Sequence, residues 1–343
     1  MRKTILVTGP DLDPVVEDLA RERGYHTVHT PPYADSDVIS ACLKESGAAA
    51  VISRMGRLDA AVMDASPQLR VISKHGVGVD NIDLAAAGER GIPVLTATGA
   101  NAVSVAEHAI ALLLAVVKRI VPLDAGMRAG RWEKPGFLGK ELSGATMGFL
   151  GMGAIAQATA RIATGFGLSL AGYDPYAHDA AFEKVGATRC LSAEDLFTRS
   201  NILSLHAPLT EDTRGIVNDQ AISRLPKGSY IVNTARGALI DEAALLAAIR
   251  SGQLAGAALD TFAVEPPPLD HPFWAEPNIV LTPHIGGVTR EAGARVGMEA
   301  LRGIIDVLEG KAVPEERIAN RAFLKVLTRG SSDVMNNTEI KMQ

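Results

Sequence analysis

A glycine-rich turn between a predicted strand and a predicted helix constrains this fold more than any other feature. The turn reads Gly151-Met152-Gly153-Ala154-Ile155-Ala156 and fits the pattern G-x-G-x-x-A. The first glycine permits a tight turn, the second lets the backbone approach a pyrophosphate, and the small last residue lets the helix pack on the strand. The turn predicts a dinucleotide-binding unit, with Gly151, Gly153 and Ala156 at the cofactor site.

An acidic residue after the next strand predicts which dinucleotide binds. Asp174 lies 23 positions after Gly151 (174 − 151 = 23). A carboxylate there accepts a hydrogen bond from a ribose 2′-hydroxyl and repels a 2′-phosphate, which favours NAD over NADP. A glycine-rich turn without a nucleotide is the alternative at this point. A second glycine pair, Gly76-Val77-Gly78, lacks the third small residue and the acid, so it is not interpreted as a dinucleotide turn.

Short strands alternate with helices on both sides of the turn, over a length of 343 residues that suits two domains. This alternation predicts parallel sheets with helices on both faces. With aromatic residues at only 4%, the core must come from Val, Ile, Leu and Ala. The predicted strands are Thr4–Thr8, Ala49–Ile52, Arg70–Ser73, Ile92–Thr96, Met147–Leu150, Leu168–Tyr173, Ile202–His206, Tyr230–Thr234, Ala257–Leu259 and Ile279–Thr282.

Two segments stand apart from this alternation. Val103–Lys118 is apolar nearly all round, which is typical of a buried connecting or interface helix. Asp124–Ser143 has no periodicity and predicts an arm ahead of the second domain. The polar tail from about Thr328 is expected to be loose.

Composition excludes several classes of partner. The net charge of −5 argues against general nucleic-acid or membrane-surface binding. Only two cysteines, Cys42 and Cys190, are present and no Cys/His cluster has metal-ligand spacing, so neither a disulfide framework nor a metal is expected. The longest apolar stretch, Ala109–Val117, is shorter than the roughly 20 residues that span a bilayer, and the N-terminal apolar run is too short for a signal peptide. A cytoplasmic protein is expected.

Three polar residues follow three of the predicted strands. Arg236, Asp260 and His284 each lie at or just after the end of a strand in the second half of the chain. Ligands of open parallel sheets bind at the carboxyl ends of strands. Taken singly, an ordinary surface arginine, a capping aspartate and a structural histidine are the simpler interpretations. Their occurrence together on the sheet with the glycine-rich turn favours an active site.

The side chains at this edge suit one kind of chemistry. Arg236 can hold a planar carboxylate through two parallel hydrogen bonds. His284 can give or take a proton, and Glu265 can orient that imidazole and favour its charged form. With a nicotinamide nearby, these parts are what hydride transfer to a 2-oxo acid, or from a 2-hydroxy acid, requires.

The chain resembles the D-isomer-specific 2-hydroxyacid dehydrogenase family, and within it the phosphoglycerate dehydrogenase branch. The resemblance covers about residues 1–320 and is specific as a set. It is carried by the segments HGVGVDNIDLAAAGERGIPV, NAVSVAEHAIALLL, GFLGMGAIA, GYDP, LSLHAPLTEDTRGIVN, NTARGALIDEAALLAAI, AALDTFAVEPP and TPHIGG.

The resemblance implies roles for individual residues. Arg236 is expected to bind and polarise the substrate, His284 to be the acid–base residue and Glu265 its partner. Asp260 is expected to meet the nicotinamide carboxamide. Further cofactor contacts are implied for Val105, Ala154, Ile155, Asp174, Ala207, Pro208, Thr213, Thr234, Ala235 and Gly286. Substrate contacts are implied for the backbone of Gly76, Val77 and Gly78, for Asn101, and for the cations Arg54, Lys74 and, from the partner subunit, Lys134.

The resemblance also implies an arrangement of domains. Two Rossmann-like doubly wound domains are expected, with an NAD-binding domain, 101–286, inserted into a discontinuous flavodoxin-like substrate domain, 1–100 and 287–325. The active site is expected in the cleft between them. The long helix and arm resemble the family's dimer-forming region, so a homodimer is expected. Residues 326–343 are expected to form a flexible tail.

Departures from the family pattern are few. Val77 replaces a hydroxyl residue found in some phosphoglycerate enzymes, and His75 is an unusual neighbour. No regulatory domain is expected after about residue 320, so a short form without serine feedback is expected.

The implied activity leaves alternatives open. The implied oxidoreductase acts on a small anionic 2-hydroxy or 2-oxo acid, with 3-phosphoglycerate the first expectation and hydroxypyruvate or glyoxylate reduction the second. Formate dehydrogenase is set aside because it expects an amide where this chain has Glu265. An NAD(H)-sensing transcriptional corepressor, which shares the fold, is the alternative of another class.

Overall fold

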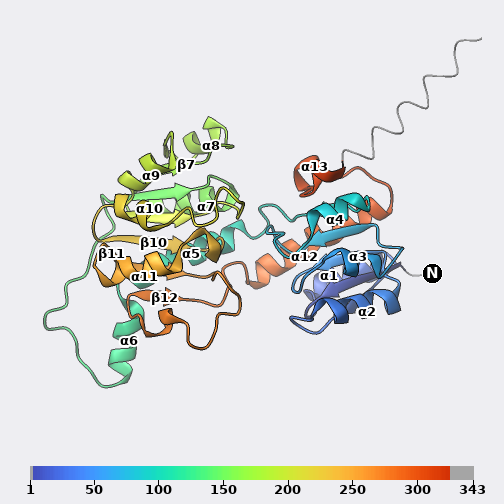
Figure 1. Ribbon diagram of the computed structural model, residues 1–343, viewed down its shortest axis with the longest axis horizontal. Helices are drawn as coiled ribbons and strands as arrows, with labels where there is room; N and C mark the ends of the chain where they lie inside the picture. Colours follow the sequence, from blue (N-terminus) through green and yellow to red (C-terminus); the bar gives the residue numbers. More distant parts are fainter. Residues whose placement is uncertain (1–2, 325–343) are drawn as a thin grey trace, which may run out of the picture. The chain divides into compact units, whose positions relative to one another are not determined.

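The computed structural model describes residues 3–324, which form two compact units (Figure 1). Within the described residues, unit 1 comprises 3–101 and 290–324, and unit 2 comprises Ala102–Thr289. The predicted domain breaks, after residues 100 and 286, differ slightly from the observed breaks after Asn101 and Thr289. The predicted tail lies outside the described residues.

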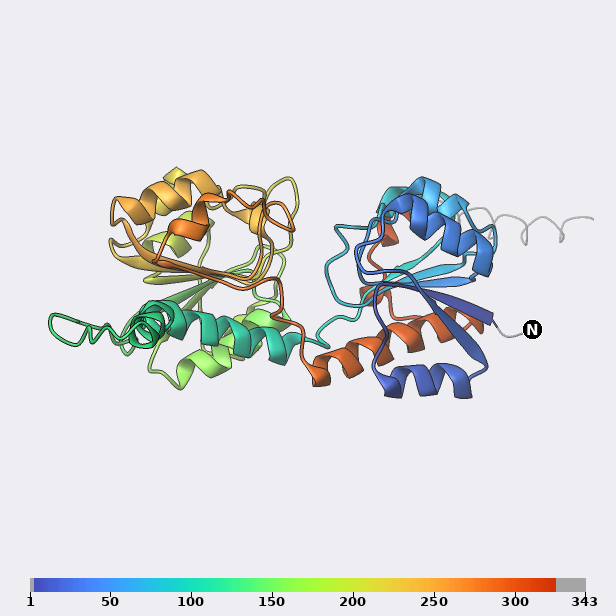
Figure 2. The ribbon, with the colours of Figure 1, turned by 90° about the horizontal axis from the view of Figure 1, so that it is seen from below.

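Unit 1 is built on a five-stranded parallel sheet with the order β2-β1-β3-β4-β5, which is the flavodoxin-like order. Helices α1 and α12 lie on one face of this sheet, and α2, α3 and α4 lie on the other (Figure 2). Apolar side chains of both groups pack against the sheet. The strands are β1 (Lys3–Thr8), β2 (Tyr25–His29), β3 (Ala50–Ser53), β4 (Val71–Lys74) and β5 (Val94–Leu95). The helices are α1 (Pro14–Glu22), α2 (Ser36–Ser46), α3 (Ala60–Asp64), α4 (Leu84–Glu89), α12 (Arg290–Leu308) and α13 (Arg321–Leu324).

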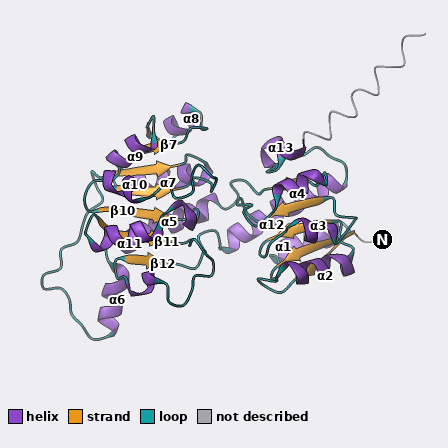
Figure 3. Ribbon diagram, viewed as in Figure 1, coloured by secondary structure: helices purple, strands orange, loops and turns teal. Residues whose placement is uncertain are grey.

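Unit 2 is built on a seven-stranded parallel sheet with the order β12-β11-β10-β9-β6-β7-β8 (Figure 3). Counted from β6, this is the doubly wound Rossmann order with one added strand. Side chains of α5, α7 and α8 pack on one face, and those of α9, α10 and α11 on the other. The strands are β6 (Thr146–Leu150), β7 (Ser169–Tyr173), β8 (Thr188–Arg189), β9 (Ile202–Leu205), β10 (Ser229–Asn233), β11 (Leu254–Leu259) and β12 (Ile279–Leu281). The helices are α5 (Ala102–Val117), α6 (Ile120–Arg128), α7 (Ala154–Thr164), α8 (Asp179–Glu183), α9 (Ala193–Arg199), α10 (Asp219–Arg224) and α11 (Glu242–Arg250).

The predicted α/β class with two parallel sheets is confirmed. The prediction of an aperiodic segment from Asp124 is wrong over its first residues, because α6 continues to Arg128. Pro122 lies in the first turn of this helix, where the missing N–H has no partner to lose, so it does not break the helix. The sequence interpretation also missed β2 and the two-residue β8. No helix between residues 3 and 324 has both the length and the apolar character needed to cross a membrane.

Candidate active site

The glycine-rich turn of unit 2 leaves open space at the start of α7. Gly151 has φ +93°, and a Cβ there would lie 2.8 Å from the backbone nitrogen of Ala207, so only glycine fits. Gly153 caps α7 without a side-chain hydrogen bond, and a Cβ on it would meet nothing within 4 Å. Ala156, in the first turn of α7, is fully buried. An uncapped helix N-terminus facing open space suits the pyrophosphate of a dinucleotide.

Asp174 has a structural role that the spacing argument missed. Its Oδ2 accepts a hydrogen bond from the backbone N–H of Met152 at 2.9 Å. Its Oδ1 accepts from the N–H groups of Tyr176 at 2.9 Å and Ala177 at 3.2 Å. A carboxylate has about four acceptor positions, so one remains for a ribose hydroxyl. Asp174 therefore fixes the glycine-rich turn and still fits the predicted cofactor contact.

The other predicted cofactor residues of unit 2 fall into two groups. At the carboxyl end of β9, Ala207 is buried, and the hydroxyl of Thr213 donates to the carbonyl of Pro208 at 2.7 Å, which closes that loop. After β10, the buried Oγ1 of Thr234 has no hydrogen-bond partner within residues 3–324. A buried polar atom of this kind is normally satisfied, so this hydroxyl fits the predicted contact of Thr234 with a cofactor. Val105 lies buried on α5.

Arg236 follows β10 in a loop that the side chain of Asn233 holds. Asn233 accepts from the N–H of Ala235 at 2.9 Å and donates from Nδ2 to the carbonyl of Arg236 at 2.8 Å. The guanidinium Nη1 of Arg236 donates to the carbonyl of Ala235 at 2.7 Å. These bonds within one turn fix the direction in which the half-buried arginine leaves the sheet.

His284 and Glu265 form the predicted pair. The Nδ1 atom of His284 lies 2.7 Å from Oε2 of Glu265, and the two side chains are 48% and 37% exposed. Since Nδ1 faces the carboxylate, Nε2 is the atom placed to exchange a proton with a ligand. The backbone of His284 has φ +54°, a left-handed conformation that costs about 1–3 kcal/mol in a residue other than glycine.

The surroundings of Glu265 keep it ionised. Burial alone raises the pKa of the Glu265 carboxyl. The hydrogen bond and charge of His284, the backbone N–H of Phe262 and the charge of Arg236 outweigh that effect, so the pKa lies below its ordinary value. The same interactions show that Arg236 and the His284–Glu265 pair share one electrostatic environment. At neutral pH, Glu265 is therefore a fixed negative charge beside the imidazole.

Asp260 anchors the loop that carries His284. It is 1% exposed, and its oxygens accept from the hydroxyl of Thr282 at 2.6 Å and from the N–H groups of Ile285 at 2.9 Å and Gly286 at 2.8 Å. Nε2 of His108, on α5, lies 3.3 Å from the same carboxylate. Burial raises the pKa of Asp260, but these hydrogen bonds outweigh it and lower the pKa overall. The sequence interpretation missed His108 altogether and saw no anchoring role for Asp260.

The predicted substrate residues of unit 1 lie at the carboxyl ends of β3 and β4. Arg54 donates from Nη1 to the carbonyls of Pro10 and Asp11, and Lys74 donates to Oδ1 of Asn81 at 2.7 Å. Burial lowers the pKa of Arg54, which still remains a cation. Arg54, just after β3, and Lys74, at the end of β4, are thus two cations at the ends of adjacent strands.

His75 follows the strand that ends in Lys74. Burial, followed by the charges of Arg54 and Lys74, lowers the pKa of His75 to about 4, so its imidazole is neutral at pH 7. Gly76 and Gly78 lie in the same loop, and Val77 is 39% exposed. Arg54, Lys74 and His75 therefore give the strand ends of unit 1 two cations and a neutral imidazole, a different set of polar side chains from that of unit 2.

Two predicted substrate residues lie away from these strand ends. Asn101 is the last residue of the first segment of unit 1, and its buried Oδ1 has no hydrogen-bond partner within residues 3–324. Lys134 is exposed in the segment between α6 and β6.

Comparison with known proteins identifies the class that this fold and site define. Residues 110–286 match the model of the D-isomer specific 2-hydroxyacid dehydrogenase, NAD binding domain. The chain belongs to this family, and unit 2 is its NAD-binding unit.

Relatives and solved structures agree with that assignment. The chain is 40% identical over 274 residues to a glyoxylate reductase of Thermofilum pendens, covering 79% of this chain and 80% of the relative. It is 38% identical over 265 residues to a D-3-phosphoglycerate dehydrogenase of Archaeoglobus fulgidus, covering 77% of this chain and 50% of the relative. A crystal structure of a Thermus thermophilus protein superposes with a TM-score of 0.83 at 38% identity, covering 91% of this chain and 98% of that one. The chain spans about half the length of the curated phosphoglycerate dehydrogenases that it matches.

Proposed function

We propose that this protein is an NAD-dependent oxidoreductase that interconverts a D-2-hydroxy acid and the corresponding 2-oxo acid. The observation that carries the proposal is the 2.7 Å contact between His284 and Glu265, in the electrostatic environment of Arg236 on the NAD-binding sheet. In this proposal unit 2 holds the cofactor and the acid–base residues.

Each residue has a defined task in the reducing direction. The bound dinucleotide supplies the hydride that reaches C2 of the 2-oxo acid. Arg236 holds the substrate carboxylate and polarises the keto oxygen, and its planar fork fixes the orientation. Nε2 of His284 donates the proton that the developing alkoxide requires. Glu265 stays ionised and favours the imidazolium before the transfer.

The preferred substrate pair is 3-phosphoglycerate and its 2-oxo form. Arg54 and Lys74 at the strand ends of unit 1 support it, because two adjacent cations suit a second anionic group such as a phosphate. Among the relatives, the name D-3-phosphoglycerate dehydrogenase recurs most often.

Glyoxylate or hydroxypyruvate reduction is the second candidate. The observation in its favour is the Thermofilum pendens glyoxylate reductase, of which this chain covers 80%, against about half of the phosphoglycerate enzymes. These substrates lack a phosphate, so they give the two cations of unit 1 no second anion to bind.

Steady-state kinetics with a panel of 2-oxo acids tests the proposal. NADH oxidation is followed with the phosphorylated 2-oxo acid, hydroxypyruvate and glyoxylate. We expect turnover with at least one of them and the highest kcat/KM with the phosphorylated compound. A preference for glyoxylate establishes the second candidate. Absence of turnover with every 2-oxo acid would contradict an enzymatic function and favour the alternative of an NAD(H)-sensing protein.

The variant Arg54→Ala connects the choice of substrate to the structure. A charge-assisted hydrogen bond contributes roughly 1.5–3 kcal/mol, so the KM for the phosphorylated substrate is expected to rise by about 10-fold or more. The KM for glyoxylate should change by less than about 3-fold, because glyoxylate lacks the second anion. Arg57→Ala, an exposed cation on the same loop, is the matched control. Equal effects on both substrates would remove Arg54 from phosphate binding.

The assembly we propose is a homodimer formed through α5, α6 and the segment that follows. This region exposes apolar side chains out of proportion to the rest of the unit: Ile120, Val121, Met127, Trp132, Phe137 and Leu138. Light scattering on the eluting protein measures the mass directly. A dimer that Leu138→Glu with Trp132→Glu converts to monomer supports the assignment, and a wild-type monomer at micromolar concentration contradicts it.

A further inference from the structure

The loop that carries Glu265 has no regular secondary structure of its own. Residues 261–270 contain neither helix nor strand, and most of them are exposed. Glu265 nevertheless lies within hydrogen-bond distance of His284. The carboxylate also accepts from the N–H of Phe262 at 3.1 Å, a bond that lies within the loop itself. Something outside the loop must therefore hold its backbone in place.

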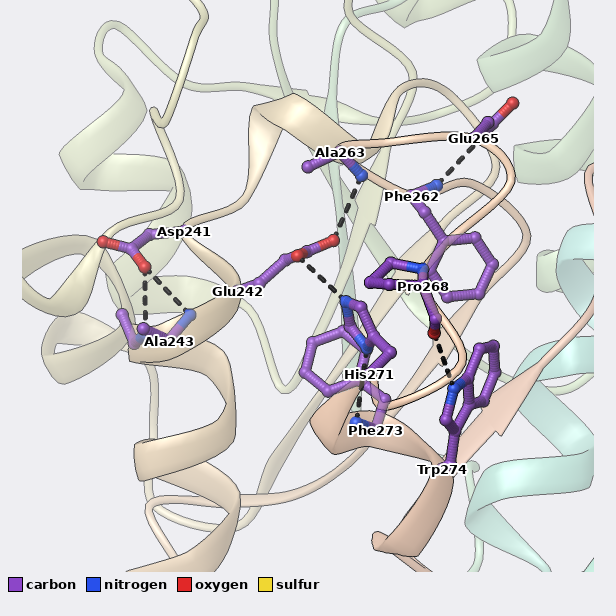
Figure 4. Close-up of polar contacts among 11 residues, drawn as sticks. Asp241, Glu242, Ala243, Phe262, Ala263, Glu265, Pro268, His271, Phe273 and Trp274 are labelled. Carbon is purple, nitrogen blue, oxygen red and sulfur yellow. Dashed lines mark hydrogen bonds and ion pairs between the residues drawn. The ribbon is translucent and has the colours of Figure 1, made fainter.

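Glu242 makes that connection from the neighbouring helix. It is the first residue of α11, and its Oε1 accepts from the N–H of Ala263 at 3.1 Å. Its Oε2 lies 3.2 Å from Nε2 of His271, at the other end of the loop (Figure 4). One carboxylate thus ties both ends of the segment that carries Glu265.

The contacts of His271 determine which nitrogen carries the proton. The side chain is 9% exposed, and its Nδ1 accepts from the N–H of Phe273 at 3.3 Å. A neutral imidazole that accepts at Nδ1 carries its hydrogen on Nε2, so His271 donates to Glu242. The ring also packs edge-on to Phe262, with centroids 5.9 Å apart. The contact with Glu242 is therefore supported by packing as well as by hydrogen bonding.

Close packing against Gly237 shows how tightly the start of the loop is held. A Cβ on Gly237 would lie 1.9 Å from the carbonyl carbon of Phe262 and 2.3 Å from the nitrogen of Ala263. Gly237 directly follows Arg236 in the chain. The backbone at Phe262 and Ala263, which Glu242 binds, is therefore in close contact with Gly237, the residue after Arg236. The position of each backbone segment constrains the position of the other.

We propose that Glu242 and His271 are positioning residues that place Glu265 against His284. This inference rests on the proposed function and adds to it two residues outside the His284–Glu265 pair. Loss of Glu242 frees the N–H of Ala263 and the end of the loop at His271. Glu265 then spends less time against the imidazole, and the charged form of His284 loses part of its support. The other charged group that acts on Glu265 is Arg236, which the change leaves in place.

The chain offers a matched control on the same helix. Asp241 caps α11 by accepting from the N–H groups of Ala243 and Ala244 at 3.0 and 3.1 Å (Figure 4). Among residues 3–324, its side-chain hydrogen bonds stay within α11 and do not reach residues 261–270. Asp241→Ala weakens the helix start, as removal of an N-cap does. It therefore reproduces damage to α11 without releasing the loop.

The test is a titration of His284 by NMR in the intact protein with ¹³C-labelled histidine, its signal assigned with His284→Ala. In Glu242→Ala the midpoint should move to lower pH by about half a unit, because the neighbouring negative charge favours the imidazolium less. In Asp241→Ala the midpoint should stay, although the melting temperature falls. In Glu265→Gln the midpoint should also fall, and adding Glu242→Ala to that variant should produce no further shift. If Glu242→Ala does not fold, Glu242→Gln, which keeps one acceptor oxygen, should show a smaller shift in the same direction.

Several results would overturn the inference. These are an unmoved midpoint in the Glu242 variants, an equal shift in Asp241→Ala, or additive shifts in the double variant. The titration needs no turnover, so it separates this inference from the proposed function. If the wild-type protein shows no turnover but Glu242→Ala still lowers the titration midpoint of His284, the proposed enzymatic function is contradicted and the positioning role is supported.

Discussion

The carboxyl ends of the two sheets carry polar residues of different kinds. In unit 2 they are acids and bases fixed by neighbours: Asp260 has hydrogen bonds to both of its oxygens, and Glu265 meets His284 at 2.7 Å. In unit 1 they are the cations Arg54 and Lys74, beside an imidazole that stays neutral. The same fold class thus carries an imidazole–carboxylate pair together with Arg236 at the strand ends of unit 2, and two cations at the strand ends of unit 1. The difference lies in the residues at or just after the ends of the strands.

The largest effect is expected where the unit 2 edge is altered. Arg236→Lys keeps the positive charge but loses the planar fork, so kcat/KM should fall by about 10²-fold or more. Binding of NADH, followed by fluorescence, should survive because the glycine-rich turn is untouched. Turnover close to that of the wild type would mean that Arg236 does not hold the carboxylate.

A smaller effect is expected at the cofactor's ribose. Asp174→Ala removes the carboxylate that repels a 2′-phosphate, so the preference of kcat/KM for NADH over NADPH should narrow by about 10-fold. Because Asp174 also accepts from the N–H of Met152, the melting temperature of the variant should fall. Equal or better kcat/KM with NADPH in the wild-type protein would show that Asp174 does not select NAD.

The smallest effect is expected from the neutral histidine of unit 1. The pKa of His75 is about 4 in the folded protein, against 6.5 for an ordinary histidine. Below pH 6.5 the unfolded chain therefore binds this proton first, and stability is lost progressively as pH falls toward 4. His75→Asn removes the titrating group and with it this loss of stability. Between pH 7 and 4.5 the melting temperature of the variant should therefore decline less than that of the wild type, with a difference on the order of a few °C. Parallel melting curves for the two proteins would contradict a His75 that is neutral in the folded protein.

The sequence predicted the sheets because their strands and helices repeat strong local signals. Met147–Leu150 and the glycines after it, for example, can only be a strand and a tight turn. Weak signals were missed. The edge strand Tyr25–His29 is mostly polar, and α6 contains proline and glycine. The irregular loop around Glu265 carries no periodicity, so nothing in the sequence indicates what holds it.

The sequence indicated the residues of the candidate site but not their support. The position of His284 after a strand predicted its place at the sheet edge, and the structure puts it against Glu265. The contacts of Asp260 with His108 and of Glu242 with His271 join residues far apart in the chain. Such pairs depend on how helices cover the sheet, which periodicity does not specify. The roles of the substrate residues in unit 1 remain predictions.

The pH dependence of the reductive reaction tests the central claim most directly. Glu265 has a lowered pKa and stays ionised through neutral pH, where it favours the imidazolium of His284. The reductive reaction needs that proton, so its kcat/KM should fall as pH rises and the imidazole loses its proton. In Glu265→Gln the alkaline limb should move to lower pH, while the oxidative reaction, which needs neutral His284, should be better retained at low pH. His284→Ala should lose most turnover together with the limb. An alkaline limb that Glu265→Gln leaves in place, with hydride transfer shown to be rate-limiting by a deuterium isotope effect, would contradict the account.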